Sequence, residues 1–365
     1  MTPTGWQGSR GRRDSLVVAF ALAVALALRL GWPLVDPVHA QPGKRSESRL
    51  RADRFIDQRI DGEMVACMYG NVFIDRDTIT AAADTAYNYR ERDFYVMIGN
   101  VRITRFATVL TCERAEYEEG LGAADFFGSV RIEEEGTIGT GERGESRGQG
   151  RYMRLIGDAL LVSPDYTVRG DTIFRDRETG LGEAFGNVKI IQPGGENLVT
   201  GEHAVFTEAD STMIVDVDPV FVSREQSGGT LTSRAELMRF LNAEDRVVMV
   251  DSVVIRQGQM LATADTAEVL GREHLVLTGA PKVSQGGTSR MSGDRIEFFY
   301  LGGQLREVVI TGSGRMEDGA PDSLAAIYQG LPSMDVIEGD SITVEFENEE
   351  ISRTVVIGNA SSQYT

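Results

Sequence analysis

A glycine returns along this sequence at a fixed spacing, and this repeat constrains the fold more than any other feature. Each glycine opens a short stretch of glycine, small polar residue and apolar residue, as in Gly70-Asn71-Val72. Equal intervals separate Gly70, Gly99, Gly128, Gly157 and Gly186, and 99 − 70 gives a period of 29. Self-similarity at a fixed period indicates one supersecondary unit copied along the chain. Such an array builds a long surface or slot rather than a compact catalytic pocket.

Each unit reads as two β-strands. Residues 79–89 and 94–103 alternate between apolar and polar side chains, and the charged turn 90–93 separates them. Turns this short permit only antiparallel neighbours. The sequence therefore predicts an all-β protein, an antiparallel meander with about two strands per 29-residue unit.

Pairs of apolar residues, spaced two apart, follow the glycine of most units. Residues two apart share one face of a strand, and the residues between these pairs are mostly charged. We therefore expect the pairs to face the interior, where they form either a packed core or the lining of an apolar slot. These predicted inward residues are Val72, Ile74, Val101, Ile103, Val130, Ile132, Val188, Ile190, Val220, Val222, Val253 and Ile255.

The glycine column predicts a crease. A glycine inside a strand marks a bulge or a close approach of backbones, so one per unit would bend the whole sheet along a line. The sheet would then fold over on itself. The segment 133–150 is rich in glycine and reads as the weakest strand. The interval from Asp294 to Asp340 exceeds one period, and this insertion places an extra loop at 316–335.

Residues 1–40 read as a secretory signal peptide. Arginines precede an apolar run over 16–28, and Val38-His39-Ala40 is a small-x-small cleavage site. An uncleaved membrane anchor over 16–35 is the alternative. Either reading places the body of the chain outside the cytoplasm. We expect a linker or irregular lead-in at 41–62 and a β-repeat domain over 63–365.

The net charge of −18 argues against nucleic acid as a partner, since that binding needs clustered Lys and Arg. The spacing between the two cysteines, Cys67 and Cys112, is not a whole number of units. Two semi-buried thiols are therefore favoured over a disulfide, which stays an alternative in an exported chain.

No motif for catalysis or metal binding emerges. Gly139-Thr-Gly-Glu-Arg-Gly144 matches G-x-G-x-x-G, but it lies in register with the repeat and no helix follows. An acidic column, including Asp84 and Glu113, lacks the close spacing of a calcium loop and reads as solvated. His203 and His274 lie more than two periods apart, too few and too distant for a zinc site. We expect a protein without enzymatic activity, cofactor or metal.

The repeated G-N-V-x-I and A-D-x-A motifs, seen at Gly70–Ile74, Ala83–Ala86, Gly99–Ile103 and Gly186–Ile190, resemble the OstA-like (organic solvent tolerance) family. That family includes the periplasmic bridge proteins of lipopolysaccharide transport, and the match covers roughly 70–365. The resemblance implies a β-jellyroll or β-taco fold, a slot that holds lipopolysaccharide acyl chains, and end-to-end stacking with other OstA-like proteins through edge strands. The weak strand at 133–150 and the loop at 316–335 depart from the family pattern.

These observations lead to a hypothesis: a periplasmic protein that carries lipopolysaccharide or a related glycolipid toward the outer membrane. A structural or adhesive β-solenoid with a filled core and no ligand is the alternative, and it would stack parallel strands about 4.8 Å apart. A lyase on a β-helix would need a cluster of acid, base and cation, which the sequence does not offer. The lipid species, the position in a transport bridge and the oligomer length are not encoded in these patterns.

Overall fold

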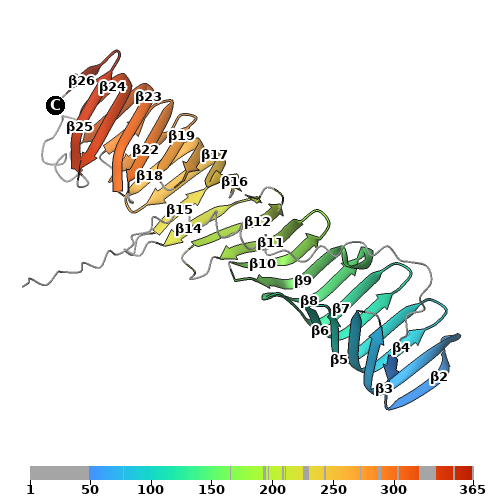
Figure 1. Ribbon diagram of the computed structural model, residues 1–365. Coiled ribbons are helices and arrows are strands. Elements are labelled where there is room, and N and C mark those ends of the chain that lie inside the picture. Colours follow the sequence, from blue (N-terminus) through green and yellow to red (C-terminus); the bar gives the residue numbers. More distant parts are fainter. Residues whose placement is uncertain are drawn as a thin grey trace, which may run out of the picture. The chain divides into compact units, whose positions relative to one another are not determined.

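The computed structural model describes residues 49–363, except for 77, 165, 192–194, 196, 208, 210, 225–229, 242–243, 272, 287–288, 302–303, 320–333 and 348–349. The described chain is almost entirely β-structure, and its 26 strands belong to one antiparallel sheet (Figure 1). It divides into two compact units. The described residues up to Val222, with Leu237–Leu241, form an N-terminal unit, and the described residues of Ser223–Glu236 and from Glu244 onward form a C-terminal unit.

Most strands of the N-terminal unit are long and follow one another as hairpins. They are β1 (Arg49–Arg51), β2 (Arg54–Ile60), β3 (Glu63–Arg76), β4 (Ile79–Tyr89), β5 (Phe94–Arg105), β6 (Thr108–Glu118), β7 (Ala123–Glu134), β8 (Thr137–Arg147), β9 (Tyr152–Val162), β10 (Thr167–Asp176), β11 (Leu181–Ile191), β12 (Asn197–Thr207), β13 (Thr212–Asp216) and β16 (Leu237–Leu241), with one 3-10 turn, η1 (Gly148–Gly150).

Strand β14 (Val220–Arg224) crosses the boundary between the units. The C-terminal unit contains β15 (Thr230–Arg234), β17 (Arg246–Gln257), β18 (Met260–Leu270), β19 (His274–Thr278), β20 (Lys282–Gln285), β21 (Ser289–Ser292), β22 (Arg295–Leu301), β23 (Gln304–Gly319), β24 (Met334–Glu347), β25 (Glu350–Ile357) and β26 (Ser361–Gln363).

The direction of the strands decides between the two predicted architectures. From β3 through β12, each strand pairs antiparallel with the next strand in sequence, as in the register Val72↔Ala83 and then Val101↔Cys112. The predicted meander of two strands per unit is confirmed. The parallel β-solenoid is excluded, because the strands pair as hairpins rather than as stacked coils.

In β3, β5, β7, β9 and β11, a β-bulge interrupts the strand at the repeated glycine. In β3, Tyr69 pairs with Thr85 and Val72 pairs with Ala83, so Gly70 and Asn71 together oppose the single residue Asp84. Both bulge residues are left-handed, with φ of 74° at Gly70 and 47° at Asn71. Glycine adopts this conformation without strain, and Asn tolerates it better than most residues, which explains the Gly-Asn pair.

The acidic column has a structural role at these bulges. A Cβ added to Gly99 would lie 2.3 Å from a carboxylate oxygen of Asp84, so the aspartate lies directly over the glycine. The side-chain amide of Asn100 donates a hydrogen bond to the same carboxylate at 2.9 Å. The same acid-over-glycine contact recurs at Asp53/Gly70, Glu113/Gly128, Glu142/Gly157, Asp171/Gly186, Asp265/Gly279, Asp294/Gly312 and Asp340/Gly358.

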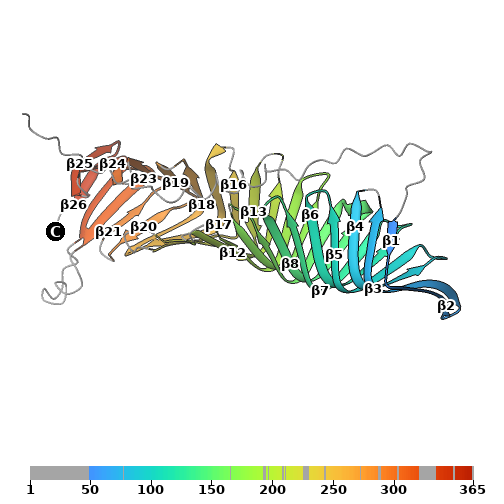
Figure 2. The ribbon, with the colours of Figure 1, turned by 60° about the horizontal axis from the view of Figure 1, so that its bottom comes forward.

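The bulges divide the sheet of the N-terminal unit into two leaves. The first leaf holds the strand segments that end at the turns 90–93, 119–122, 148–151 and 177–180; the second leaf holds those that end at the turns 106–107 and 135–136 and at the connection 163–166. The strands bend between these segments, so the leaves fold toward each other (Figure 2). The predicted crease is therefore present, and it follows the bulge line.

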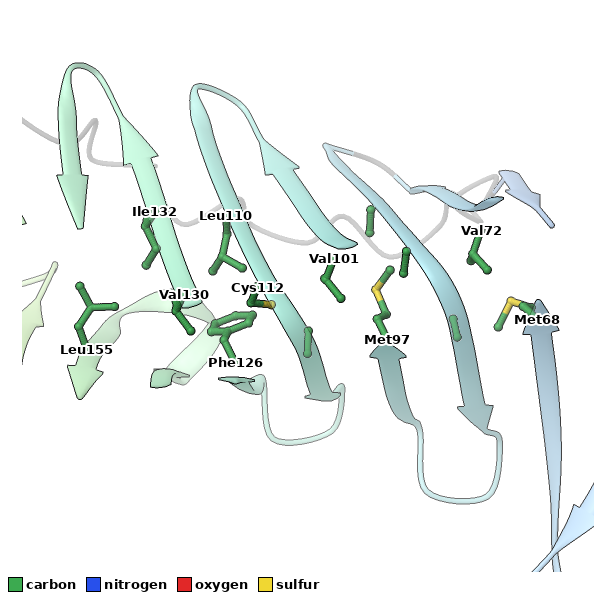
Figure 3. Packing of buried hydrophobic residues seen from close by; sticks show 14 of the residues in the cluster. Met68, Val72, Met97, Val101, Leu110, Cys112, Phe126, Val130, Ile132 and Leu155 are labelled. Atoms are coloured by element: carbon green, nitrogen blue, oxygen red, sulfur yellow. The ribbon is translucent and has the colours of Figure 1, made fainter. Parts of the chain in front are cut away.

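The core of the N-terminal unit lies between these leaves. One cluster of buried residues joins Met68, Met97 and Phe126 of the first leaf to Val101 and Val130 of the second leaf. Figure 3 shows these side chains in a row along the inside of the folded strands. Neighbouring hairpins of this unit add apolar side chains to both leaves, so they share one interior.

Other segments differ from the sequence-based expectation or lie outside the described residues. Within 41–62, β1 and β2 form regular strands that pair with β3, and 41–48 lie outside the described residues. The glycine-rich β8 is fully paired with β7 and β9. Most of the expected loop at 316–335 and the whole of 1–40 lie outside the described residues. The described residues contain no helix that is long and apolar enough to cross a bilayer.

Candidate functional site

Most of the predicted inward residues have little exposure to solvent. Eight of the twelve are nearly fully buried, namely Val72, Val101, Val130, Ile132, Val188, Ile190, Val253 and Ile255. Ile74 and Ile103 are half-buried and pack against the core cluster. Within the set, Ile132 alone also lines the cavity described below.

Val220 and Val222 are a correction. In β14 the buried residues are Phe221 and Ser223, at 3% and 2% exposure, and the two valines are only half-buried on the opposite face. The bulge explains the change of phase. Its two left-handed residues here are Val217 and Asp218, each with φ of 58°, so the first inward position falls on Pro219. The prediction of Val220 and Val222 places Asp218 at the position of the repeated glycine. The bulge begins one residue earlier, at Val217.

A second inward column was missed by the sequence analysis. The residue two positions before each repeated glycine is also buried, and this column holds Met68, Met97, Phe126, Leu155 and Ala184. These residues belong to the first leaf, and they recur with the same period as the glycine. The signal was therefore present in the alternation on the N-terminal side of the glycine, where the side chains vary more in size than the Val and Ile that follow it.

A cavity of about 110 Å³ opens between the two leaves of the N-terminal unit. Ile132, Leu161 and Val168 line it from the second leaf, and Leu155 and Phe206 line it from the first leaf. Met153, Tyr166 and Ile173 complete the apolar wall. The interior here is an apolar slot that both leaves form, which is the kind of surface that receives an alkyl chain.

The glycine-rich strand β8 explains why the space lies here. Position 139 is a glycine, whereas the corresponding inward positions of β4 and β6 are Ala81 and Leu110. Leu155 reaches into the space above Gly139, since a Cβ there would lie 2.9 Å from its Cδ1 atom. A strand with glycine at an inward position leaves room between the leaves, so the departure from the repeat pattern at 133–150 coincides with the cavity.

Charged side chains lie at the border of the cavity. Glu134 ends β7 on the second leaf, and Arg177 follows β10 on the first leaf. Their carboxylate and guanidinium groups are 3.6 Å apart, with side chains 7% and 31% exposed. The hydroxyl of Thr108 donates a hydrogen bond of 2.7 Å to the other oxygen of Glu134. This ion pair therefore joins the free edges of the two leaves beside the slot.

The pKa values of both partners reflect their partial burial. Burial raises the pKa of Glu134, and the hydrogen bond from Thr108 and the charge of Arg177 act in the opposite direction. Burial lowers the pKa of Arg177; Glu134 offsets this, while the positive charges of Arg175 and Arg105 add to it. Three guanidinium groups thus lie close enough to influence one another around one carboxylate.

Each histidine in the described part of the chain contacts one carboxylate. His203 contacts Asp216 at 2.8 Å and stacks on Phe185, and His274 contacts Glu297 at 2.8 Å. No group of three or more His, Cys, Asp or Glu side chains in this part of the chain could hold a metal ion. Both cysteines are buried and unbridged, on β3 and β6.

No known family model matches the sequence, and no curated protein matches it. Among solved structures, the chain is similar to LptH of Pseudomonas aeruginosa, described as the LptA-homologous periplasmic component of the conserved lipopolysaccharide transport device. The identity is 12%, the match covers 47% of this chain and 92% of that one, and the TM-score is 0.25. A likeness this distant leaves the function to be inferred from the chain's own residues.

Proposed function

We propose that this protein is a non-enzymatic lipid carrier that holds acyl chains of lipopolysaccharide or a related glycolipid between its two leaves. The observation that carries the proposal is the apolar slot to which Leu155 and Phe206 contribute from one leaf and Ile132 from the other. The repeated motifs that resemble the OstA-like family support the choice of glycolipid.

The proposal places the protein in the periplasm, on the path toward the outer membrane. An exported chain with the signal-peptide pattern of residues 1–40 fits that location. The predicted inward residues, apart from Val220 and Val222, would line the interior of the unit to which each belongs, and a packed interior over the same residues is the competing outcome.

Edge strands supply a way to bind other transport proteins. In the described part of the chain, β2 pairs with β3 and β25 pairs with β24, so each keeps one edge that no described strand covers. Uncovered edges accept a strand from another chain through main-chain hydrogen bonds. We propose that OstA-like proteins stack on these edges.

Site-specific photo-crosslinking in cells tests the carrier role. A diazirine-bearing aliphatic residue at Ile173, which is half-buried at the slot, should form an adduct with glycolipid. The same residue at Ile132 probes the opposite leaf. Glu133, the exposed neighbour of Ile132, is the matched control and should give no adduct. A folded protein that captures no glycolipid at either slot position, or as much at Glu133, contradicts the proposed function.

A further inference from the structure

The rim of the slot has an excess of positive charge. Arg175 lines the cavity together with Glu134. Arg177 lies 3.6 Å from Glu134, and the charges of Arg175 and Arg105 both act on Arg177. Glu135, Arg154 and Glu183 also line the cavity, so four guanidinium groups stand against three carboxylates. This local excess contrasts with the net charge of −18 of the whole chain.

These groups come from both edges of the folded sheet. Arg105 ends β5 and Glu134 ends β7, both on the second leaf, whereas Arg175 and Arg177 lie at the end of β10 on the first leaf. The cluster therefore surrounds the opening through which a chain would pass between the leaves. Its arginine side chains are partly exposed to solvent, so a ligand group at the opening can reach them.

The apolar wall begins directly beside the arginines. Ile173 is two residues before Arg175 on the same strand, and both line the cavity, as does Leu155 on the neighbouring strand β9. A molecule that fits this arrangement has an alkyl chain for the interior and a compact polar group for the rim. Guanidinium groups bind phosphate and carboxylate through paired N–H donors, and a partly desolvated rim strengthens such contacts.

We propose that the slot selects amphiphiles with an anionic head group, which binds at Arg175 and Arg177 while the alkyl chain lies between the leaves. Glu134 is the internal counter-ion that holds Arg177 in place at the rim. The inference rests on the proposed function, because it assumes that an alkyl chain enters the slot, and it adds the charge of the ligand. Phosphate and carboxylate share the chemistry that the arginines recognise.

Binding measurements with three single-chain probes below their micelle concentrations test the proposal. Dodecyl phosphate and dodecanoate carry the two anionic groups, and dodecanol has the same chain without charge. The wild-type protein should bind both anions at least about tenfold more tightly than the alcohol. The Arg175→Gln/Arg177→Gln variant should lose this preference and bind dodecanol within about twofold of wild type.

Two further variants separate charge recognition from loss of structure. Arg114→Gln, which removes an exposed arginine paired with Glu116 on the outer face, should keep the anion preference. Arg175→Lys retains the charge and should keep much of it. The proposal is overturned if the wild-type protein binds anions and alcohol equally well, or if Arg114→Gln also loses the preference for anions. Either result leaves the proposed function intact. Failure of all three probes to bind overturns the proposed function as well.

Discussion

The carboxylate of Glu134, at the free edge of one leaf, lies 3.6 Å from the guanidinium group of Arg177 at the free edge of the other. The two residues are far apart in the hairpin order, and only the crease brings them together. By contrast, Arg151 and Asp176 form an ion pair within the first leaf, on neighbouring strand ends. The Glu134–Arg177 distance therefore depends directly on how closely the two leaves approach each other at the slot.

Replacing Arg177 with Gln should destabilise the protein more at pH 7 than at pH 4. Burial raises the pKa of Glu134, so its contribution to stability is full below its unfolded pKa and is lost as the pH rises. Arg177 limits that loss. Without Arg177, the free energy of unfolding should fall below that of wild type by about 1–2 kcal/mol at neutral pH. Urea unfolding at the two pH values measures it. A deficit that is equal at both would show that the ion pair does not control Glu134.

Gly99→Ala should destabilise the protein by about 2–3 kcal/mol. The residue has φ of 78°, and its Cβ would lie 2.3 Å from the carboxylate of Asp84. Gly62→Ala is the matched control, since φ is 89° there but nothing lies within 4 Å of an added Cβ. The control should cost about 1 kcal/mol from the backbone alone. Equal losses in denaturant titrations would mean that the acid over the glycine has no steric consequence.

The corrected phase of β14 predicts which of its side chains matter. Phe221→Ala should cost about 3–5 kcal/mol, because the ring is 3% exposed. Val222→Ala, on the opposite face, should cost less than about 1.5 kcal/mol. Thermal unfolding of the two variants checks this order. The reverse order would restore the original assignment of Val222 to the interior.

Cys112 should react slowly with thiol reagents in the native state. Burial raises the pKa of its thiol to about 11, so about one molecule in a thousand carries the thiolate at pH 8. A Cys67→Ala variant isolates this thiol. Its reaction with a chromogenic disulfide should be at least about a hundredfold slower than in urea. Rapid labelling of the folded variant would contradict the burial of this side chain.

Asp176 should contribute to acid sensitivity. A hydrogen bond from Arg151 lowers the pKa of this carboxyl from 3.8 to about 2. Its contribution to stability is therefore present above pH 3.8 and is lost as the pH falls toward 2. Arg151→Gln should destabilise the protein at pH 5, and the difference from wild type should shrink by pH 2. Arg90→Gln removes an exposed pair with Asp57 and should change stability little at either pH.

The sequence predicted the meander and the crease because both are periodic. A glycine that must be left-handed, and must leave space for Asp84 or its counterparts, recurs at the same place in most units. The phase of β14 was wrong because Val217 takes the position of the glycine there, and a valine gives no sign of a left-handed backbone. No local pattern could show that Glu134 meets Arg177, since that contact depends on the approach of two leaves. The glycines of β8 were a sequence signal of the cavity, but they were interpreted as the mark of a weak strand.

Each bulge is completed by residues of its own and the adjacent hairpin, as with Asp84, Gly99 and Asn100. The bend is therefore specified locally, hairpin by hairpin, and does not depend on how many hairpins the sheet contains. Removing or duplicating one whole period would change the length of the folded sheet and leave its cross-section unchanged. Length and cross-section can thus vary independently. The number of hairpins sets how far the folded sheet extends, and the cross-section sets which molecules fit between its leaves.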